Sequence, residues 1–278
     1  MSANPLTFSS HGSLPQHNIG ADPLEAASSK VPQVALAFWI IKIAATTLGE
    51  TGGDALSMTL NLGYLVSTVI FMACFLIALA VQVRAKRFHP FLYWTVIVTT
   101  TTVGTTMADY ADRSLGVGYV GGSLILFALL MTVLGIWRHS VGSVSFTNIS
   151  SPKVEIFYWI TILFSNTLGT ALGDFLADTS GVGYERGALV FAGALTLVAA
   201  AYFFTRVSHT ILFWTAFILT RPLGATLGDL LTKPRENGGL DLSRISSSLA
   251  IAVFMVACIL LTHQAPGRHP GEQYRKPE

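Results

Sequence analysis

The chain has 278 residues, of which 51% are hydrophobic and only 12% are charged, and its formal net charge is +2. A typical soluble domain carries about 25% charged residues, so this composition argues against a cytosolic enzyme and against a disordered chain. The small net charge and the two cysteines exclude a nucleic-acid binder, a disulfide scaffold and a cysteine-rich metal site, which leaves a polytopic membrane protein.

The two ends of the chain differ from the rest. Residues 1–33 contain polar side chains and four prolines, without the basic start and apolar stretch of a signal peptide. We predict that 1–33 and 263–278 are disordered cytoplasmic tails. Between them lie eight apolar runs, each long enough to cross a bilayer as a helix. The predicted spans are roughly 36–56, 62–83, 91–111, 117–137, 156–177, 183–204, 211–231 and 243–262.

Positive charge gathers on one side of the predicted spans. An even number of spans places both termini on the same side, where tails and loops carry ten cationic residues: Lys30, Arg84, Lys86, Arg87, Arg138, Lys153, Arg206, Arg268, Arg275 and Lys276. The opposite loops carry five: Arg113, Arg186, Lys233, Arg235 and Arg244. Because positive loops stay inside, both termini are predicted to be cytoplasmic.

One motif recurs four times, as WIIKIAATTLGETGGD, WTVIVTTTTVGTTMAD, WITILFSNTLGTALGD and WTAFILTRPLGATLGD. In every copy a glycine follows the tryptophan by ten residues and an aspartate follows it by fifteen. This spacing predicts four tandem two-span repeats, in a first half 34–140 and a second half 141–262. Because each repeat has two spans, all four repeats have the same orientation in the membrane. We therefore predict that they are related by rotation about the membrane normal.

These motifs resemble a family of bacterial inner-membrane proteins built from four tandem two-span repeats of unknown function, each with a characteristic tryptophan. The resemblance covers about residues 34–262. It implies a multi-pass protein of the bacterial inner membrane and brings no activity with it. The fold class that we predict is all-α, with about eight transmembrane helices in four parallel two-helix repeats.

The motif residues suggest structural roles. Tryptophans near the cytoplasmic start of a span are typical interface anchors, here Trp39, Trp94, Trp159 and Trp214. Small residues four apart let helices approach closely in lipid. The helix-packing residues predicted on this basis are Gly49, Gly53, Gly104, Gly169, Gly173, Gly224 and Gly228.

The four motif aspartates suggest a metal site. A carboxylate at the centre of a membrane helix costs roughly 2.5–3.5 kcal/mol, and less near the helix end. The predicted metal ligands are Asp54, Asp109, Asp174, Asp229 and, one turn before Asp54, Glu50. Oxygen ligands suit hard cations. The alternative is that each aspartate only caps a helix end.

A stripe of hydroxyl and amide groups leads toward the acids. The predicted substrate path consists of Thr47, Thr51, Thr102, Thr106, Thr167, Thr226 and Asn166. The alternative is that each threonine hydroxyl bonds back to a carbonyl of its own helix.

Two cations break the repeat. Lys42 stands where the other copies have isoleucine or phenylalanine, and Arg221 where they have threonine or asparagine. We predict a gating or counterion role for both, with Arg221 pairing with Glu50 across helices. The alternative for Lys42 is that it extends to the cytoplasmic interface.

These features favour a transporter of a hard cation, such as a proton-coupled exporter of Mn²⁺ or Mg²⁺. A channel is a close variant, since a ring of four helices would enclose a pore. The alternatives are a non-transporting scaffold or sensor, and a small-anion transporter that uses Lys42 and Arg221. No catalytic motif is present, so no enzyme activity and no cofactor are expected. The expected partners are the lipid bilayer and a small inorganic ion, without nucleic acid.

Overall fold

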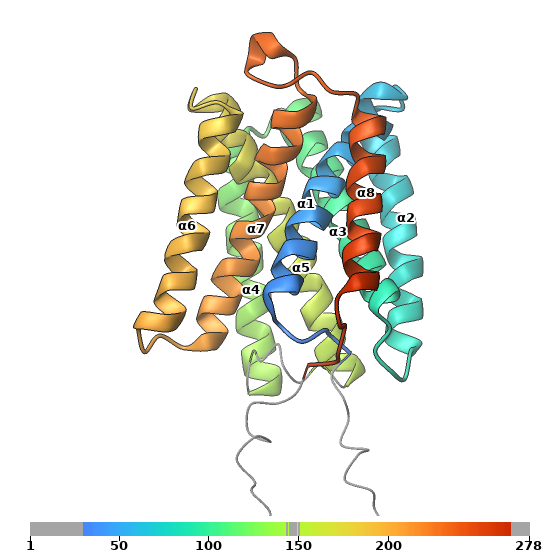
Figure 1. The fold of residues 1–278 in the computed structure, drawn as a ribbon, viewed down its shortest axis with the longest axis vertical. Coiled ribbons are helices and arrows are strands. Elements are labelled where there is room, and N and C mark those ends of the chain that lie inside the picture. Colours follow the sequence, from blue (N-terminus) through green and yellow to red (C-terminus); the bar gives the residue numbers. More distant parts are fainter. Residues whose placement is uncertain (1–29, 143, 145–148, 150, 268–278) are drawn as a thin grey trace, which may run out of the picture.

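The structure is a computed structural model that describes residues 30–142, 144, 149 and 151–267. Within these ranges it contains eight long α-helices and no β-strand, so the predicted all-α class is confirmed (Figure 1). The helices are α1 (Leu36–Asp54), α2 (Gly63–Arg84), α3 (Pro90–Asp109), α4 (Tyr119–Val141), α5 (Pro152–Asp174), α6 (Tyr184–Phe204), α7 (His209–Thr232) and α8 (Arg244–Leu261).

The odd-numbered helices form a closed inner ring. Helix α1 packs against α3 and α7, and α5 packs against the same two helices. Each even-numbered helix lies outside the ring against the inner helix of the next repeat: α2 on α3, α4 on α5, α6 on α7 and α8 on α1. The ring joins the two predicted halves into one body. In it every repeat makes equivalent contacts with the repeats on its two sides.

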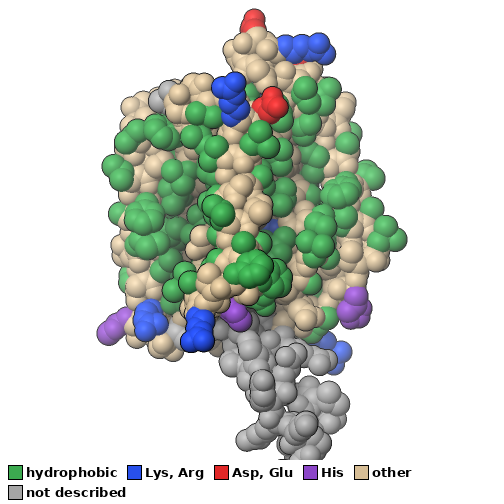
Figure 2. Space-filling view, turned by 60° about the vertical axis from the view of Figure 1, so that its left-hand side comes forward, with side chains coloured by type: hydrophobic (Ala, Val, Ile, Leu, Met, Phe, Trp, Pro, Cys, Tyr) green, Lys and Arg blue, Asp and Glu red, His purple; other side chains and the backbone are tan. Residues whose placement is uncertain are grey.

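The outer helices present apolar side chains to the surroundings (Figure 2). Leucine, phenylalanine and isoleucine residues such as Ile77, Leu124, Leu197 and Phe203 are exposed on them. Six helices, all except α1 and α3, are long and apolar enough to cross a membrane. Helices α1 and α3 carry threonines and acids on their buried faces, which lowers their hydropathy, although they pack in the same ring. The chain is a multi-pass membrane protein.

Each motif aspartate ends its α-helix or lies close to the helix end. In the first three repeats a π-helical turn follows at once: η2 (Ala55–Thr59), η3 (Tyr110–Ser114) and η4 (Phe175–Thr179). In the fourth repeat α7 continues to Thr232, and the short 3-10 turn η5 (Arg235–Asn237) follows. The fourth repeat therefore differs from the others in the backbone structure that follows its aspartate.

The four tryptophans lie inward, in an aromatic layer near the start of the inner helices. Trp94, Trp159 and Trp214 are buried. The aromatic residue before each tryptophan contacts the tryptophan of the next repeat, with ring centroids 5.5–6.1 Å apart: Phe38 with Trp94, Tyr93 with Trp159, Tyr158 with Trp214, and Phe213 with Trp39. These ring contacts join neighbouring repeats, because aromatic rings bury large apolar surfaces against one another, and the interface-anchor role expected from the sequence stays a prediction.

The ends of the described chain are held in place beneath this layer. Gln33 N donates to Ala265 O at 2.8 Å, and Gly267 N donates to Val31 O at 2.9 Å. The Lys30 ammonium lies 2.8 Å from Glu155 Oε2, and both side chains are almost fully buried. Residues 30–33 and 263–267 are therefore part of the fold, which corrects the predicted tail boundaries. The remaining residues of both predicted tails lie outside the described residues.

Candidate functional site

Four axial layers run through the ring. On every inner helix the residues three, seven, eleven and fifteen positions after the tryptophan are buried, with at most 3% of their surface exposed. Such residues lie about one turn apart on one helix face. From the aromatic layer outward, the layers are Lys42, Ile97, Ile162 and Phe217; Thr46, Thr101, Asn166 and Arg221; Glu50, Thr105, Thr170 and Ala225; and Asp54, Asp109, Asp174 and Asp229.

The motif glycines bring these layers together. Each motif glycine packs against the second-layer residue of the next repeat: Gly49 against Thr101, Gly104 against Asn166, Gly169 against Arg221, and Gly224 against Thr46. One turn later, Gly53 contacts Thr105, Gly173 contacts Ala225 and Gly228 contacts Glu50. All seven predicted helix-packing glycines therefore lie at contacts between inner helices.

A buried ion pair joins Glu50 to Arg221. Arg221 Nη2 lies 2.8 Å from Glu50 Oε2, and Thr105 Oγ1 donates to the same carboxylate oxygen at 3.2 Å. Arg221 is fully buried and Glu50 is 3% exposed. This is the pair that the sequence predicts across helices. It neutralises one acid, and Arg221 Nε and Nη1 have no hydrogen-bond partner among the described residues.

Lys233 bridges two of the motif aspartates. Its Nζ lies 3.2 Å from Asp54 Oδ2 and 3.1 Å from Asp229 Oδ1, so one ammonium joins the first repeat to the fourth. Arg244 approaches Asp54 Oδ2 at 3.6 Å. Burial acts to lower the pKa of the Lys233 ammonium, but the two aspartates outweigh burial and raise its pKa well above the ordinary value.

Arg113 bridges the other two aspartates. Its Nε lies 2.9 Å from Asp109 Oδ1, and its Nη2 lies 3.9 Å from Asp174 Oδ2. Arg113 and Lys233 each follow a motif aspartate by four residues, which is the spacing of neighbours on a helix. Both residues lie in predicted outer loops, where no such role was expected from the sequence, although their shared spacing from an aspartate is a signal for it.

Three carboxylates lie close enough to share one cation. Ligand oxygens of Glu50, Asp54 and Asp229 all lie within 4.8 Å of one another, and all three residues are buried. We call these three residues the acid cluster. Asp54 Oδ1 is buried and has no hydrogen-bond partner among the residues described. Asp109 and Asp174, which the sequence also predicts as ligands, are outside the cluster and pair with Arg113.

Most of the predicted substrate-path hydroxyls bond to their own helices. They donate to backbone carbonyls three or four residues earlier, at 2.8–3.5 Å, in the cases of Thr47, Thr51, Thr102, Thr106, Thr167 and Thr226. Thr51 Oγ1 also accepts from Ser248 of α8. These threonines therefore adopt the alternative arrangement, in which each hydroxyl bonds back to a carbonyl of its own helix, because that carbonyl is the nearest acceptor. Asn166 differs, because it lies in an axial layer and donates to Thr100 Oγ1 at 3.3 Å.

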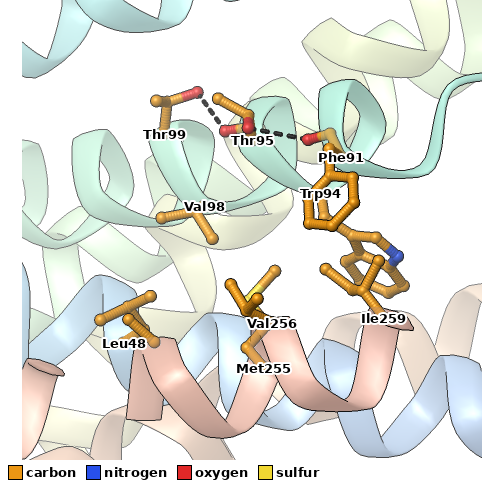
Figure 3. Close-up of a pocket in the computed structure, with 10 residues that line it drawn as sticks. Leu48, Phe91, Trp94, Thr95, Val98, Thr99, Met255, Val256 and Ile259 are labelled. Atoms are coloured by element: carbon orange, nitrogen blue, oxygen red, sulfur yellow. Dashed lines mark hydrogen bonds between the residues drawn. The ribbon is translucent and has the colours of Figure 1, made fainter. Parts of the chain in front are cut away.

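Two grooves on the outside of the bundle are lined almost entirely by apolar side chains. The first lies between α3 and α8, where Trp94, Val98, Met255 and Ile259 line it (Figure 3). The second lies over α1 and α8 and includes Ile43 and Phe254. Neither is lined by any residue of the axial layers. The polar chemistry of the protein is therefore concentrated inside the ring.

The four repeats are also recognised by comparison with known proteins. No curated protein and no solved structure matches the chain. The family model described as Repeat of Unknown Function (DUF347) matches four consecutive stretches, residues 37–88, 92–142, 157–208 and 212–265. Each stretch contains one inner and one outer helix. The chain therefore belongs to the DUF347 repeat family, with four tandem copies of the repeat.

Proposed function

We propose that this protein transports a hard divalent cation, Mn²⁺ or Mg²⁺, across the bacterial inner membrane in exchange for protons. The observation that carries the proposal is the acid cluster, in which oxygens of Glu50, Asp54 and Asp229 lie within 4.8 Å of one another inside the ring. Carboxylate oxygens are the ligands that Mn²⁺ and Mg²⁺ prefer. Ionisable residues at membrane depth are costly, and they commonly mark an ion pathway.

Protein cations hold the acid cluster in the arrangement described. Lys233 pairs with both Asp54 and Asp229, and Arg221 pairs with Glu50. A divalent cation among the three carboxylates would take over the role of these two side chains. Binding therefore requires Lys233 and Arg221 to move away, which links cation occupancy to a rearrangement of α7 and of the segment after it.

The second pair of aspartates has a different role in this proposal. Asp109 and Asp174 share Arg113, and the residue equivalent to Glu50 is Thr105 in the second repeat and Thr170 in the third, so no carboxylate of that layer accompanies them. We assign them to a clamp that keeps α3 and α5 together. The cation then binds between the first and fourth repeats, to one side of the ring axis.

The small-anion alternative is less favoured. Of the two cations that an anion site would use, Arg221 is already paired, with Nη2 2.8 Å from Glu50 Oε2, and Lys42 alone has no hydrogen-bond partner among the described residues. The scaffold alternative requires the acids to serve helix ends alone. Three of the motif aspartates, Asp54, Asp109 and Asp174, each precede a π-turn and make no side-chain cap hydrogen bond there.

The test is cation flux into proteoliposomes that contain the purified full-length protein, with Mn²⁺ or Mg²⁺ outside and an imposed proton gradient. The wild type should move the cation, and Glu50→Gln, Asp54→Asn and Asp229→Asn should each reduce the flux strongly. Glu236→Gln is the control, because Glu236 is an exposed acid in the loop after α7. Equal flux in all four variants and the wild type would remove the acid cluster from the mechanism. Anion flux that disappears in Arg221→Gln would favour the anion transporter instead.

A further inference from the structure

Lys42 lies in an axial layer that is otherwise apolar. The equivalent residues in the other repeats are Ile97, Ile162 and Phe217, and all four side chains are fully buried. Lys42 Nζ has no hydrogen-bond partner within the described part of the chain. Its polar contact is with the face of the Phe217 ring, whose centroid lies 4.2 Å from Nζ. A ring face attracts an ammonium group, but far less than a carboxylate would at membrane depth.

The helices around Lys42 bring no acid to it. Its charged neighbour is Arg221 of α7, one layer toward the acid cluster. On α1 itself the next acid is Glu50, two turns away and paired with Arg221. The remaining titratable or charged groups on the packed helices are Tyr93 and Asp109 of α3, His209 and Asp229 of α7, and Cys258 and Arg244 of α8. Tyr93 shares a 2.8 Å hydrogen bond with Tyr158 of α5, and Asp109 and Asp229 lie in the aspartate layer, three layers from Lys42. Arg244 lies at the far end of the bundle, against Asp54.

Arg221 connects Lys42 with the acid cluster. While Arg221 is paired with Glu50, the carboxylate offsets part of its positive charge, so Arg221 repels a proton on Lys42 less than a free guanidinium group would. When a divalent cation takes the Glu50 carboxylate, Arg221 loses its partner and its charge acts on Lys42. Two like charges close together in a low-dielectric environment disfavour each other. Cation binding at Glu50 and a proton on Lys42 therefore disfavour each other.

We propose that Lys42 carries the proton that this protein exchanges for its cation, and this proposal rests on the transport function proposed above. With the acid cluster free of metal, Nζ holds the proton as an ammonium over Phe217. On cation binding an N–H bond breaks, the electron pair stays on Nζ, and the proton leaves to water, so that the free amine remains. When the cation departs, Arg221 returns to Glu50 and Nζ takes up a proton again.

The experiment uses the purified full-length chain in proteoliposomes that contain a Mn²⁺-sensitive dye or a pH dye. In the wild type, Mn²⁺ entry should drive protons outward. Lys42→Met should still let Mn²⁺ move down its own gradient, but proton movement and the dependence of Mn²⁺ flux on pH should be lost. Lys42→Arg keeps a fixed charge beside Arg221 and should abolish Mn²⁺ flux. The matched control is Ile97→Met, which changes the same layer in the second repeat and should keep both fluxes.

A binding measurement in detergent gives a second readout. Mn²⁺ binding should release protons from the wild type and not from Lys42→Met. If Lys42→Met does not fold, Lys42→Gln takes its place, with the same expected result. Wild-type proton movement per Mn²⁺ in the folded Lys42 variants would overturn the role of Lys42 and leave the transport function standing. Mn²⁺ flux without proton movement in the wild type would overturn the role of Lys42 together with the proton exchange, and would leave only cation transport standing. Absence of both Mn²⁺ and Mg²⁺ flux in the wild type would overturn the transport function and the role of Lys42 together.

Discussion

Gly224 of the fourth repeat packs directly against Thr46 of the first. A Cβ atom at Gly224 would lie 2.5 Å from Cβ of Thr46 and 2.8 Å from its carbonyl carbon. Thr46 Oγ1 also donates to Thr220 O at 3.1 Å, so the two helices are joined by packing and by a hydrogen bond. This contact closes the ring, because the three other contacts of the same kind join repeats that are consecutive in the chain.

Gly224→Ala should therefore destabilise the protein. The added methyl group requires α1 and α7 to separate, and overpacking of this kind typically costs about 1–3 kcal/mol. Gly52→Ala is the matched control, since a Cβ atom at Gly52 meets nothing within 4 Å and alanine favours a helix. Thermal unfolding in detergent should show a lower midpoint for Gly224→Ala alone. Equal midpoints for the two variants would mean that α1 and α7 do not pack as described.

The four aspartates should not respond alike to substitution. Asp54→Asn and Asp229→Asn remove ligands of the acid cluster, so Mn²⁺ binding should weaken by about tenfold or more, since a charged contact contributes roughly 1.5–3 kcal/mol. Asp109→Asn and Asp174→Asn should leave binding near the wild-type value and lower stability, because Arg113 would lose a partner. Calorimetric Mn²⁺ titration and thermal unfolding of the four variants separate these effects. Similar losses of Mn²⁺ binding in all four variants would indicate that the cation binds at the ring axis, among all four aspartates.

Removal of Lys233 should strengthen cation binding. In Lys233→Met the protein's own ammonium no longer competes for Asp54 and Asp229, so Mn²⁺ should bind more tightly. The same change should destabilise the metal-free protein, because two buried carboxylates lose their counterion. Arg235→Gln is the control, since Arg235 is exposed two residues further on. The measurement is the rise in the unfolding midpoint with added Mn²⁺, and a smaller rise in Lys233→Met than in wild type would argue against competition.

The Lys233 ion pairs also predict a pH dependence. The folded-state pKa of Lys233 is raised, so its contribution to stability is complete below the pKa of the unfolded chain and is lost as pH rises through the folded-state value. Stability should therefore be insensitive to Lys233 titration near neutral pH. In strongly alkaline solution the difference in unfolding free energy between wild type and Lys233→Met should shrink. A difference that already shrinks near neutral pH would contradict the raised pKa.

The sequence predicts the repeats and the contacts that follow from their symmetry. Equal spacing of Gly49, Gly104, Gly169 and Gly224 from their tryptophans is enough to place these residues at equivalent helix contacts. The pairing of Arg221 with Glu50 also follows from aligning the repeats, because the two residues lie in adjacent axial layers. Symmetry is thus readable from sequence wherever each repeat supplies the same residue type.

Departures from symmetry were not predictable in the same way. Lys233 lies beyond the end of α7, and its reach back to Asp54 depends on how the fourth repeat ends without a π-turn. The tryptophans occupy positions typical of interface anchors, and only the packing of Phe38, Tyr93, Tyr158 and Phe213 against them shows that they lie inward. Such features depend on contacts between repeats and not on local residue patterns.

The pair formed by Lys30 and Glu155 should stabilise the end of the ring at which the inner helices begin. Lys30 Nζ lies 2.8 Å from Glu155 Oε2 and donates to Val83 O at 2.9 Å, so it joins the N-terminal segment to α5 and to the end of α2. Lys30→Gln or Glu155→Gln leaves the other charge buried and alone, which typically costs about 3–5 kcal/mol. Lys86→Gln, an exposed lysine of the loop after α2, should change little.

A double-mutant cycle separates this pair from general effects of each substitution. If the two side chains act on each other, the double variant Lys30→Gln with Glu155→Gln should be more stable than the sum of the two single losses implies, because no buried charge is left without a partner. Loss of the ion pair in either single variant should also loosen residues 30–33, which bond to the C-terminal segment through Gln33 N and Ala265 O. Limited proteolysis should then cut the single variants near residue 30 faster than the wild type. Additive losses in the cycle, with unchanged proteolysis, would mean that this segment is held by its backbone hydrogen bonds and not by the ion pair.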